Sequence, residues 1–262
     1  MFYIQLSYLV YCDKMKTKMN TQLAIFTLII LFTTSFYLIN VNLAQQNYDR
    51  RSINLNYIDS APLEILNDTA LASYASSGDG SVATPYIIED LNITTTASAA
   101  LQIMSVTTHF IIRDCLLIAG EVGLYAYQIN PNVGEISNNI MKATDGGLWV
   151  QECDYLNITH NVCYGSTIGM DFEDSDHLLL ESNTCYGNGQ GIYIETCNYL
   201  TLYDNSLYSN SQNGAYISTN SNFPNITYNR FYSNTRTGLL VDNSKQKPSS
   251  TAVLSEMILF VV

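Results

Sequence analysis

The chain has 262 residues, a formal net charge of −12, 47% hydrophobic but only 13% charged residues, and 20 tyrosines. Residues 52–244 contain 20 aspartates and glutamates against four cations, Arg113, Lys142, Arg230 and Arg236, so they lack the clustered cations that a nucleic-acid partner requires. The length allows one or two domains, and low charge with abundant Tyr, Asn, Ser and Thr favours a β-rich extracellular protein over a cytosolic enzyme.

Residues 1–44 are predicted to be a signal peptide or an N-terminal membrane anchor. Lys14, Lys16 and Lys18 precede an apolar, uncharged run over residues 23–39, which is typical of an export signal. Residues 42–44 match a cleavage site poorly, and the run is at the short limit for spanning a bilayer, so cleavage and retention both stay open, as do starts at Met1 and Met15. Either way, this segment contacts the membrane during export, and the protein is expected to be secreted or on the cell surface.

Residues 45–75 are polar and irregular, and we interpret them as a linker and N-terminal cap. Residues 76–243 then repeat one pattern, in which Ile or Leu stands three residues before Asn or Asp and a glycine follows eight or nine residues later. The polar positions are Asp114, Asn139, Asn161, Asn183, Asn205 and Asn229, and the glycines are Gly123, Gly147, Gly169, Gly191, Gly214 and Gly238. A period of 22–25 residues indicates a solenoid, whose units bury their apolar faces against their neighbours.

The residues after each glycine alternate between apolar and polar, which predicts strands rather than helices. The fold class predicted is all-β, a right-handed parallel β-helix of about six to seven turns that stack at the ~4.8 Å spacing of paired strands. Asparagine tolerates left-handed backbone angles at corners. Stacked asparagines also form amide ladders, so we expect the regular Asn positions to be structural.

A family resemblance follows from these residues. The Gly78-Asp79-Gly80-Ser81 turn, the Pro-Tyr-Ile-Ile-Glu strand at residues 85–89 and repeats of the form Asn-x-Cys/Leu-Tyr…Gly-Ile-Tyr-Ile resemble right-handed parallel β-helix repeat proteins. The likeness covers residues 76–243 and is nearest to the secreted group related to periplasmic copper-binding repeat proteins and carbohydrate-binding β-helix domains. That group includes lyases, hydrolases, epimerases and adhesins, so the resemblance implies a fold and not an activity. Copper binding is not carried over, because His109, His160 and His177 fall in different columns of the repeat.

Residues 244–262 break the repeat and form a C-terminal tail or cap. An open solenoid end needs cover, which a capping strand would supply, although a truncated reading frame explains the tail equally well. Among the six cysteines, Cys163 and Cys185 fall in one inward column on adjacent turns, within disulfide range, whereas Cys153 and Cys197 lie two turns apart with Ser175 between them. Small core residues are the favoured interpretation, with a Cys163–Cys185 disulfide as the alternative.

Candidate function lies at the outward positions after the glycines. The ligand-binding candidates are Tyr125, Trp149, Asp171, Tyr193 and Tyr216, which should form one column on a flat face beside a second column of Tyr127, Gln151, Glu173, Glu195, Ser218 and Asp242. Exposed rings beside carboxylates and amides suit sugars, whose apolar faces lie on rings while their hydroxyls bond to polar neighbours. The alternative is that these aromatics are simply good strand residues in cross-turn stacks.

The densest acidic run, residues 171–176, allows three interpretations. Asp171 and Glu173 should point the same way, with Glu195 one turn from Glu173. The three carboxylates are candidates for a calcium site, for an acid/base pair in glycoside hydrolysis, or for a solvated acidic edge. No catalytic candidate is suggested beyond these three carboxylates, and no cofactor other than calcium.

The sequence therefore predicts an exported β-helix that binds a polysaccharide or surface glycan without catalysis. A polysaccharide-cleaving enzyme of the hydrolase or lyase type is the second hypothesis. Signature motifs of polygalacturonase-like hydrolases are absent from the sequence, and a lyase lacks a basic residue on this face. A structural or adhesive scaffold is the third hypothesis.

Overall fold

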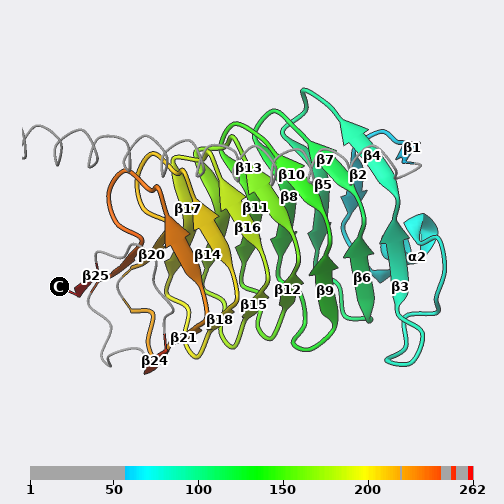
Figure 1. Cartoon of the computed structure of the whole chain (residues 1–262). Helices are drawn as coiled ribbons and strands as arrows, with labels where there is room; N and C mark the ends of the chain where they lie inside the picture. The colour runs from blue at the N-terminus through cyan, green and yellow to red at the C-terminus, as the bar shows by residue number, and fades with distance from the viewer. Residues whose placement is uncertain (1–56, 219, 243–248, 252–258, 262) are drawn as a thin grey trace, which may run out of the picture. The chain divides into compact units, whose positions relative to one another are not determined.

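Three parallel sheets wrap around one elongated core in the computed structural model (Figure 1). The structure describes residues 57–218, 220–242, 249–251 and 259–261. The predicted signal or anchor, Cys12 and residues 243–248 lie outside these ranges. Among the described residues, no helix is both long enough and apolar enough to cross a membrane.

Each strand pairs in parallel with a strand one turn away along the chain. The first sheet contains β1 (Ile58–Asp59), β4 (Leu91–Thr94), β7 (Leu116–Ile118), β10 (Ile140–Lys142), β13 (Val162–Tyr164), β16 (Thr184–Tyr186), β19 (Ser206–Tyr208) and β22 (Arg230–Tyr232). The second contains β2 (Leu63–Ile65), β5 (Ala99–Met104), β8 (Val122–Tyr127), β11 (Gly146–Gln151), β14 (Ile168–Glu173), β17 (Gln190–Glu195), β20 (Ala215–Ile217), β23 (Leu239–Val241) and β25 (Leu259–Val261). The third contains β3 (Tyr86–Glu89), β6 (Phe110–Arg113), β9 (Gly134–Ser137), β12 (Asn157–Thr159), β15 (Leu179–Glu181), β18 (Thr201–Tyr203), β21 (Asn225–Thr227) and β24 (Ser249–Thr251).

The two inward columns of the second sheet are buried, as the alternation predicted. They contain Leu124, Leu148, Met170, Ile192, Ala215 and Leu239, and then Ala126, Val150, Phe172, Ile194, Ile217 and Val241. Parallel pairing keeps each column in register from turn to turn. The all-β fold class is therefore confirmed, with about seven turns.

The asparagine column is a buried amide ladder. Asn183 Nδ2 donates to Asn205 Oδ1 at 3.1 Å and to the Ile158 carbonyl at 2.8 Å, and Asn139, Asn161 and Asn205 repeat this arrangement. The ladder satisfies backbone groups at a corner where no strand partner is present. The left-handed conformation falls on the residue before each ladder position, such as Ser182 at φ 55°, so the ladder asparagines do not adopt the left-handed angles that we expected.

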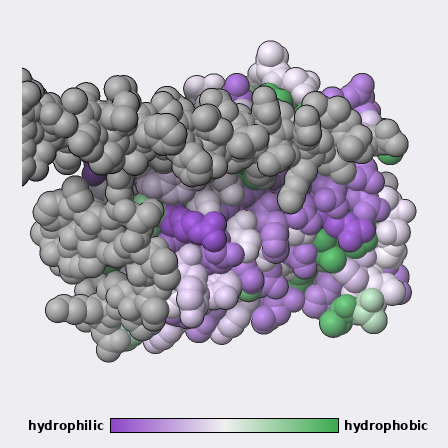
Figure 2. All heavy atoms as spheres, in the orientation of Figure 1, coloured by the Kyte–Doolittle hydropathy of each residue, from purple (hydrophilic) through white to green (hydrophobic). Residues whose placement is uncertain are grey.

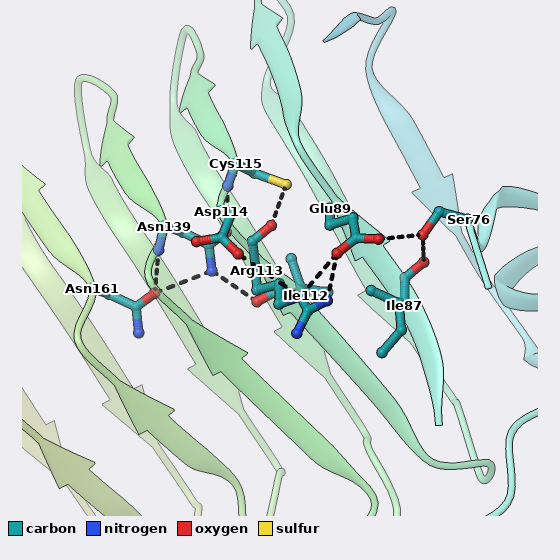
Figure 3. Close-up of polar contacts among 9 residues, drawn as sticks. All are labelled: Ser76, Ile87, Glu89, Ile112, Arg113, Asp114, Cys115, Asn139 and Asn161. Carbon is teal, nitrogen blue, oxygen red and sulfur yellow. Dashed lines mark hydrogen bonds and ion pairs between the residues drawn. The ribbon is translucent and has the colours of Figure 1, made fainter. Parts of the chain in front are cut away.

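Assignment of Asp114 to this ladder is wrong. The Cys115 amide donates to Asn139 Oδ1 at 3.0 Å, so Cys115 occupies the ladder position in that turn (Figure 3). Asp114 takes the preceding left-handed position at φ 53°. The error arose because Ile111 and Ile112 are adjacent, and it is Ile112 that pairs with Ile136 and points inward.

Four of the repeat glycines, Gly123, Gly147, Gly169 and Gly191, are the second residue of a strand, and Gly214 and Gly238 directly precede one. A Cβ added to Gly191 would stand 2.2 Å from the Gly214 carbonyl oxygen, and one added to Gly147 would stand 2.7 Å from that of Gly169. Successive turns therefore approach too closely there for any side chain. The glycine column is needed for close stacking of turns.

The solenoid begins earlier than residue 76. Within the predicted linker, β1 pairs with β4 and β2 pairs with β5. They are followed by α2 (Asp68–Tyr74), which lies at the N-terminal end of the solenoid (Figure 1). Asn67 caps this helix by accepting from the Ala70 amide at 2.9 Å, and its Leu71 is fully buried.

The C-terminal strands extend two of the sheets. β24 pairs with β21 in the third sheet, and β25 pairs with β23 in the second. This pairing is what the capping alternative for residues 244–262 requires.

Candidate functional site

The outward face of the second sheet carries the predicted site residues. Register pairs Tyr125 with Trp149, Trp149 with Asp171, Asp171 with Tyr193, and Tyr193 with Tyr216. The neighbouring column pairs Gln151 with Glu173 and Glu173 with Glu195. The structure therefore brings all of these residues onto one face, in the order that the repeat predicted.

From turn to turn, the rings in the outward column of this face are tilted against one another, although Tyr125 stacks on Tyr127 of its own strand, with centroids 6.1 Å apart and planes inclined by 13°. Tyr125 and Trp149 have ring centroids 5.8 Å apart with planes inclined by 58°, and Tyr193 and Tyr216 are 5.5 Å apart at 69°. Asp171 separates the two pairs. The tilt of Trp149, Tyr193 and Tyr216 leaves parts of their faces uncovered by these neighbouring rings, and an uncovered ring face is the surface that a sugar ring would contact.

A pocket of about 390 Å³ lies at the N-terminal part of this face. The sheet contributes Gln102, Tyr125, Trp149 and Gln151 to its lining, and residues 62–64, 97–99 and 121–122 surround them. Tyr125 Oη donates to Gln151 Oε1 at 3.2 Å, which holds the ring against the sheet. Aromatic rings and amides therefore line the same hollow, in the size range of small-ligand pockets.

Asp171 is buried although it belongs to the outward column. The residue is 8% exposed, and its Oδ1 atom is buried without a hydrogen-bond partner. Burial, with Glu173 and Glu195 as further causes, raises the pKa of Asp171 to about 7. The interpretation of this run as a solvated acidic edge is therefore wrong for Asp171, because register places it between Trp149 and Tyr193.

The carboxyls beside Asp171 are partly exposed. Burial and the charge of Glu195 raise the pKa of Glu173. Tyr193 Oη donates to Glu195 Oε2 at 2.9 Å. The three side chains form an acidic centre on the face.

The described residues contain no group of three or more His, Cys, Asp or Glu placed to hold a metal ion. Asp171, Glu173 and Glu195 are therefore not arranged to hold a calcium ion in this structure. The calcium site stays a prediction that the geometry does not favour.

Two aromatic columns elsewhere are stacked face to face and were missed by the sequence reasoning. Tyr155, His177, Tyr199 and Phe223 lie at the corner between the second and third sheets, with centroids 4.4, 4.9 and 4.9 Å apart and planes within 7–8° of parallel. Tyr164, Tyr186, Tyr208 and Tyr232 form the other stack on the first sheet, at 5.4, 5.3 and 4.7 Å. Their regular recurrence every 22 or 24 residues was the signal that could have found them.

The cysteines occupy the predicted columns. Cys163 pairs in register with Cys185, and both are buried with free thiols. The Cys153 amide donates to Ser175 Oγ at 2.9 Å, which agrees with Ser175 lying between Cys153 and Cys197 in one column. The described cysteines serve as small core residues.

In the view of Figure 2, the visible described surface is mostly hydrophilic, with few hydrophobic side chains. The four cations of residues 52–244 all lie off the second sheet. Arg113 is on β6, where it pairs with Glu89 (Figure 3), Lys142 is on β10, Arg230 is on β22, and Arg236 follows β22. The second sheet therefore presents carboxylates without cations.

The fold and its repeats define a parallel β-helix protein. A family model for the right handed beta helix region matches residues 109–252, which is more than half of the chain, so the chain belongs to this family. The predicted right-handed parallel β-helix family is thus confirmed, while the nearer likeness to copper-binding repeat proteins stays a prediction.

Two similar solved structures are A-modules of mannuronan C-5 epimerases from Azotobacter vinelandii. The AlgE4 module is 11% identical with a TM-score of 0.41, over 61% of this chain and 56% of the module. The AlgE6 module is 13% identical with a TM-score of 0.43, over 67% of this chain and 61% of the module. The chain thus spans about three fifths of these structures. A comparison with curated proteins finds no match.

Proposed function

We propose that this protein binds carbohydrate, without catalysis, through the outward face of the second sheet. The observation that carries the proposal is the pocket in which the mutually tilted rings of Tyr125 and Trp149 meet the amides of Gln102 and Gln151. Apolar ring faces and amide groups match the two kinds of surface that a sugar presents.

The alternative that these aromatics only stabilise the sheet fits other columns better. In the stacks through Tyr186 and Tyr199, neighbouring planes lie within 6–8° and cover one another's faces. Tyr125 stacks on Tyr127 within its own strand, but the rings of Tyr125 and Trp149 on successive turns are inclined by 58°, so a parallel cross-turn stack does not account for Trp149.

The test is glycan-array binding with three variants. Trp149→Ala should lower binding at least tenfold, because the ring lines the pocket, and Tyr193→Ala should lower it if the ligand extends along the column. Tyr199→Ala is the matched control, since Tyr199 is 51% exposed but stacked between His177 and Phe223. Unchanged binding in Trp149→Ala and Tyr193→Ala would contradict the proposal, and a lack of saturable binding by the unaltered protein would favour the scaffold hypothesis.

A polysaccharide-cleaving enzyme is the second candidate, and one observation favours it. Asp171, with a pKa of about 7, lies two residues from Glu173, and a protonated carboxyl beside an ionised one is the pair that glycoside hydrolysis uses. Release of reducing sugar from polysaccharides that is lost in Glu173→Gln would establish this candidate. Absence of release from a broad polysaccharide panel would exclude it.

We also propose that the protein is exported. The support is sequence alone, Lys14, Lys16 and Lys18 before the apolar run of residues 23–39. Fractionation of cells that express the full chain, with the N-terminus of the product sequenced, tests this proposal. A product that begins after the apolar run indicates a cleaved signal, an intact membrane-bound product indicates an anchor, and an intact product free in the cytosol contradicts export.

A further inference from the structure

Two unpaired polar atoms occupy neighbouring positions on the proposed binding face. Trp149 Nε1 and Asp171 Oδ1 are both buried without a hydrogen-bond partner. The two residues are register partners on β11 and β14. One atom is a donor, and the other belongs to a carboxyl that accepts.

Buried polar atoms are nearly always paired, so an orphaned pair of this kind indicates a group that binds there. Gln190 Nε2, at the first position of β17, is a third buried atom without a partner, on a residue that is 7% exposed. Gln190 is the register partner of Ile168 and its Oε1 accepts from Asn213 Nδ2 at 3.4 Å, so it lies outside the Trp149–Asp171 position.

A hydroxyl group fits the Trp149–Asp171 pair because it both accepts and donates. Its oxygen would accept from Trp149 Nε1, and its proton would go to Asp171 Oδ1. At pH 8, above the pKa of about 7 of Asp171, both carboxyl groups would be ionised, so a ligand carboxylate would have no proton to donate and would leave Asp171 Oδ1 unpaired. It would also bring a negative charge beside Asp171, Glu173 and Glu195.

The side chains around the Trp149–Asp171 pair would also disfavour the binding of an anionic ligand. The titratable groups that face Asp171 are Glu173 on its own strand and Glu195 and Tyr193 on β17, whereas β11 presents the uncharged Trp149 and Gln151. Glu64 and Glu121 line the adjacent pocket. None of the four cations of residues 52–244 is on the second sheet, so a bound carboxylate would meet carboxylates and no counter-charge.

We propose that the Trp149–Asp171 position is a subsite for one hydroxyl of an uncharged saccharide, and that this face selects neutral polysaccharides over polyuronates. The inference rests on the proposed carbohydrate binding and names the class of carbohydrate.

The test is a glycan array printed in matched pairs, each neutral oligosaccharide beside its counterpart oxidised to the carboxylate at C6. Mannan beside mannuronan and cello-oligosaccharides beside glucuronan are two such pairs. At 0.15 M salt and pH 8, the neutral member should bind at least tenfold more tightly. The ratio should shrink in 1 M NaCl, because salt screens the repulsion.

The outcomes separate this inference from the function on which it rests. Equal or tighter binding of the uronate members would overturn the selection for neutral sugars and leave carbohydrate binding intact. Binding of neither member of any pair would overturn both.

Variants test the subsite itself. Asp171→Asn keeps a side-chain oxygen that accepts, so neutral binding should stay within threefold, whereas Asp171→Leu should lower it at least tenfold. The double variant Glu173→Gln, Glu195→Gln should lower the neutral-to-uronate ratio at least threefold. Thermal unfolding of each variant shows that the fold is retained, and equal neutral binding by folded Asp171→Leu and the unaltered protein would overturn the subsite.

Discussion

The side chain of Asn183 joins three turns of the solenoid. Its Nδ2 donates to Asn205 Oδ1 at 3.1 Å and to the Ile158 carbonyl at 2.8 Å, while its Oδ1 accepts from the Asn161 amide at 3.0 Å. Asn183 is completely buried. The Asn205 side chain, the Ile158 carbonyl and the Asn161 amide therefore all depend on it for these hydrogen bonds.

Asn183→Ala should therefore lower the free energy of unfolding by about 2–4 kcal/mol, since each buried group left unpaired costs about 1–3 kcal/mol. Urea denaturation measures the loss. Asn157→Ala is the control, because Asn157 is exposed on β12, and it should change stability by less than about 0.5 kcal/mol. Equal effects of the two substitutions would show that the ladder does not stabilise the fold.

Gly191→Ala should be more damaging than Gly187→Ala. A Cβ at Gly191 would stand 2.2 Å from the Gly214 carbonyl oxygen, whereas one at Gly187 has no atom within 4 Å. Gly187 has φ +64°, so alanine there costs only the left-handed strain of about 1–2 kcal/mol. We expect Gly191→Ala to lower the free energy of unfolding by about 3 kcal/mol or to prevent folding. Similar urea midpoints for the two variants would contradict the close stacking of turns.

Stability should depend on pH through Asp171. Its pKa is 3.8 in an ordinary setting and about 7 in the folded protein, so the folded state retains a proton that the unfolded state releases between these values. The contribution of neutral Asp171 to the free energy of unfolding is therefore lost as pH rises from about 4 to 7.

Asp171→Asn removes this titration. The variant should gain stability relative to the unaltered protein as pH rises, with an upper bound of about 4 kcal/mol at pH 8 from about 1.4 kcal/mol for each pKa unit, and the difference should vanish near pH 4. Thermal unfolding at pH 4, 6 and 8 measures this change. A difference that is constant with pH would show that Asp171 does not retain its proton.

His177 lies between two parallel rings, 4.4 Å from Tyr155 and 4.9 Å from Tyr199. His177→Ala should lower the free energy of unfolding by about 1–2 kcal/mol, since each aromatic pair contributes about 0.5–1.5 kcal/mol. His177→Phe keeps a ring in the stack and should lose less than half as much. If both variants unfold alike, the ring contacts do not stabilise this corner.

The described cysteines should resist alkylation in the folded protein. Burial raises the pKa of Cys115, Cys153 and Cys197 to about 12 and that of Cys163 well above its ordinary value, so the reactive thiolate is scarce at neutral pH. Iodoacetamide labelling mapped by mass spectrometry should modify these four sites, and Cys185, only after denaturation. A Cys163–Cys185 disulfide would instead leave that pair unlabelled after denaturation without reductant.

The sequence by itself determined the repeat and its register. The recurrence of Asn161, Asn183 and Asn205 at 22-residue steps, followed by period-two alternation, is enough to predict parallel strands, an inward column and an outward column, because each turn can bury its apolar face only against its neighbours. Tyr125, Trp149 and Asp171 could be placed on one face for the same reason.

Only the tertiary structure decided what each position in a column experiences. Register cannot distinguish rings that stack, as at Tyr155 and His177, from rings that tilt, as at Tyr125 and Trp149, because ring orientation depends on packing across turns. Nor could it show that Asp171 is buried, since outward position fixes the direction of a side chain but not its exposure. Those two facts, the tilt of the rings between turns and the buried carboxyl, distinguish the proposed binding face from the rest of a regular solenoid.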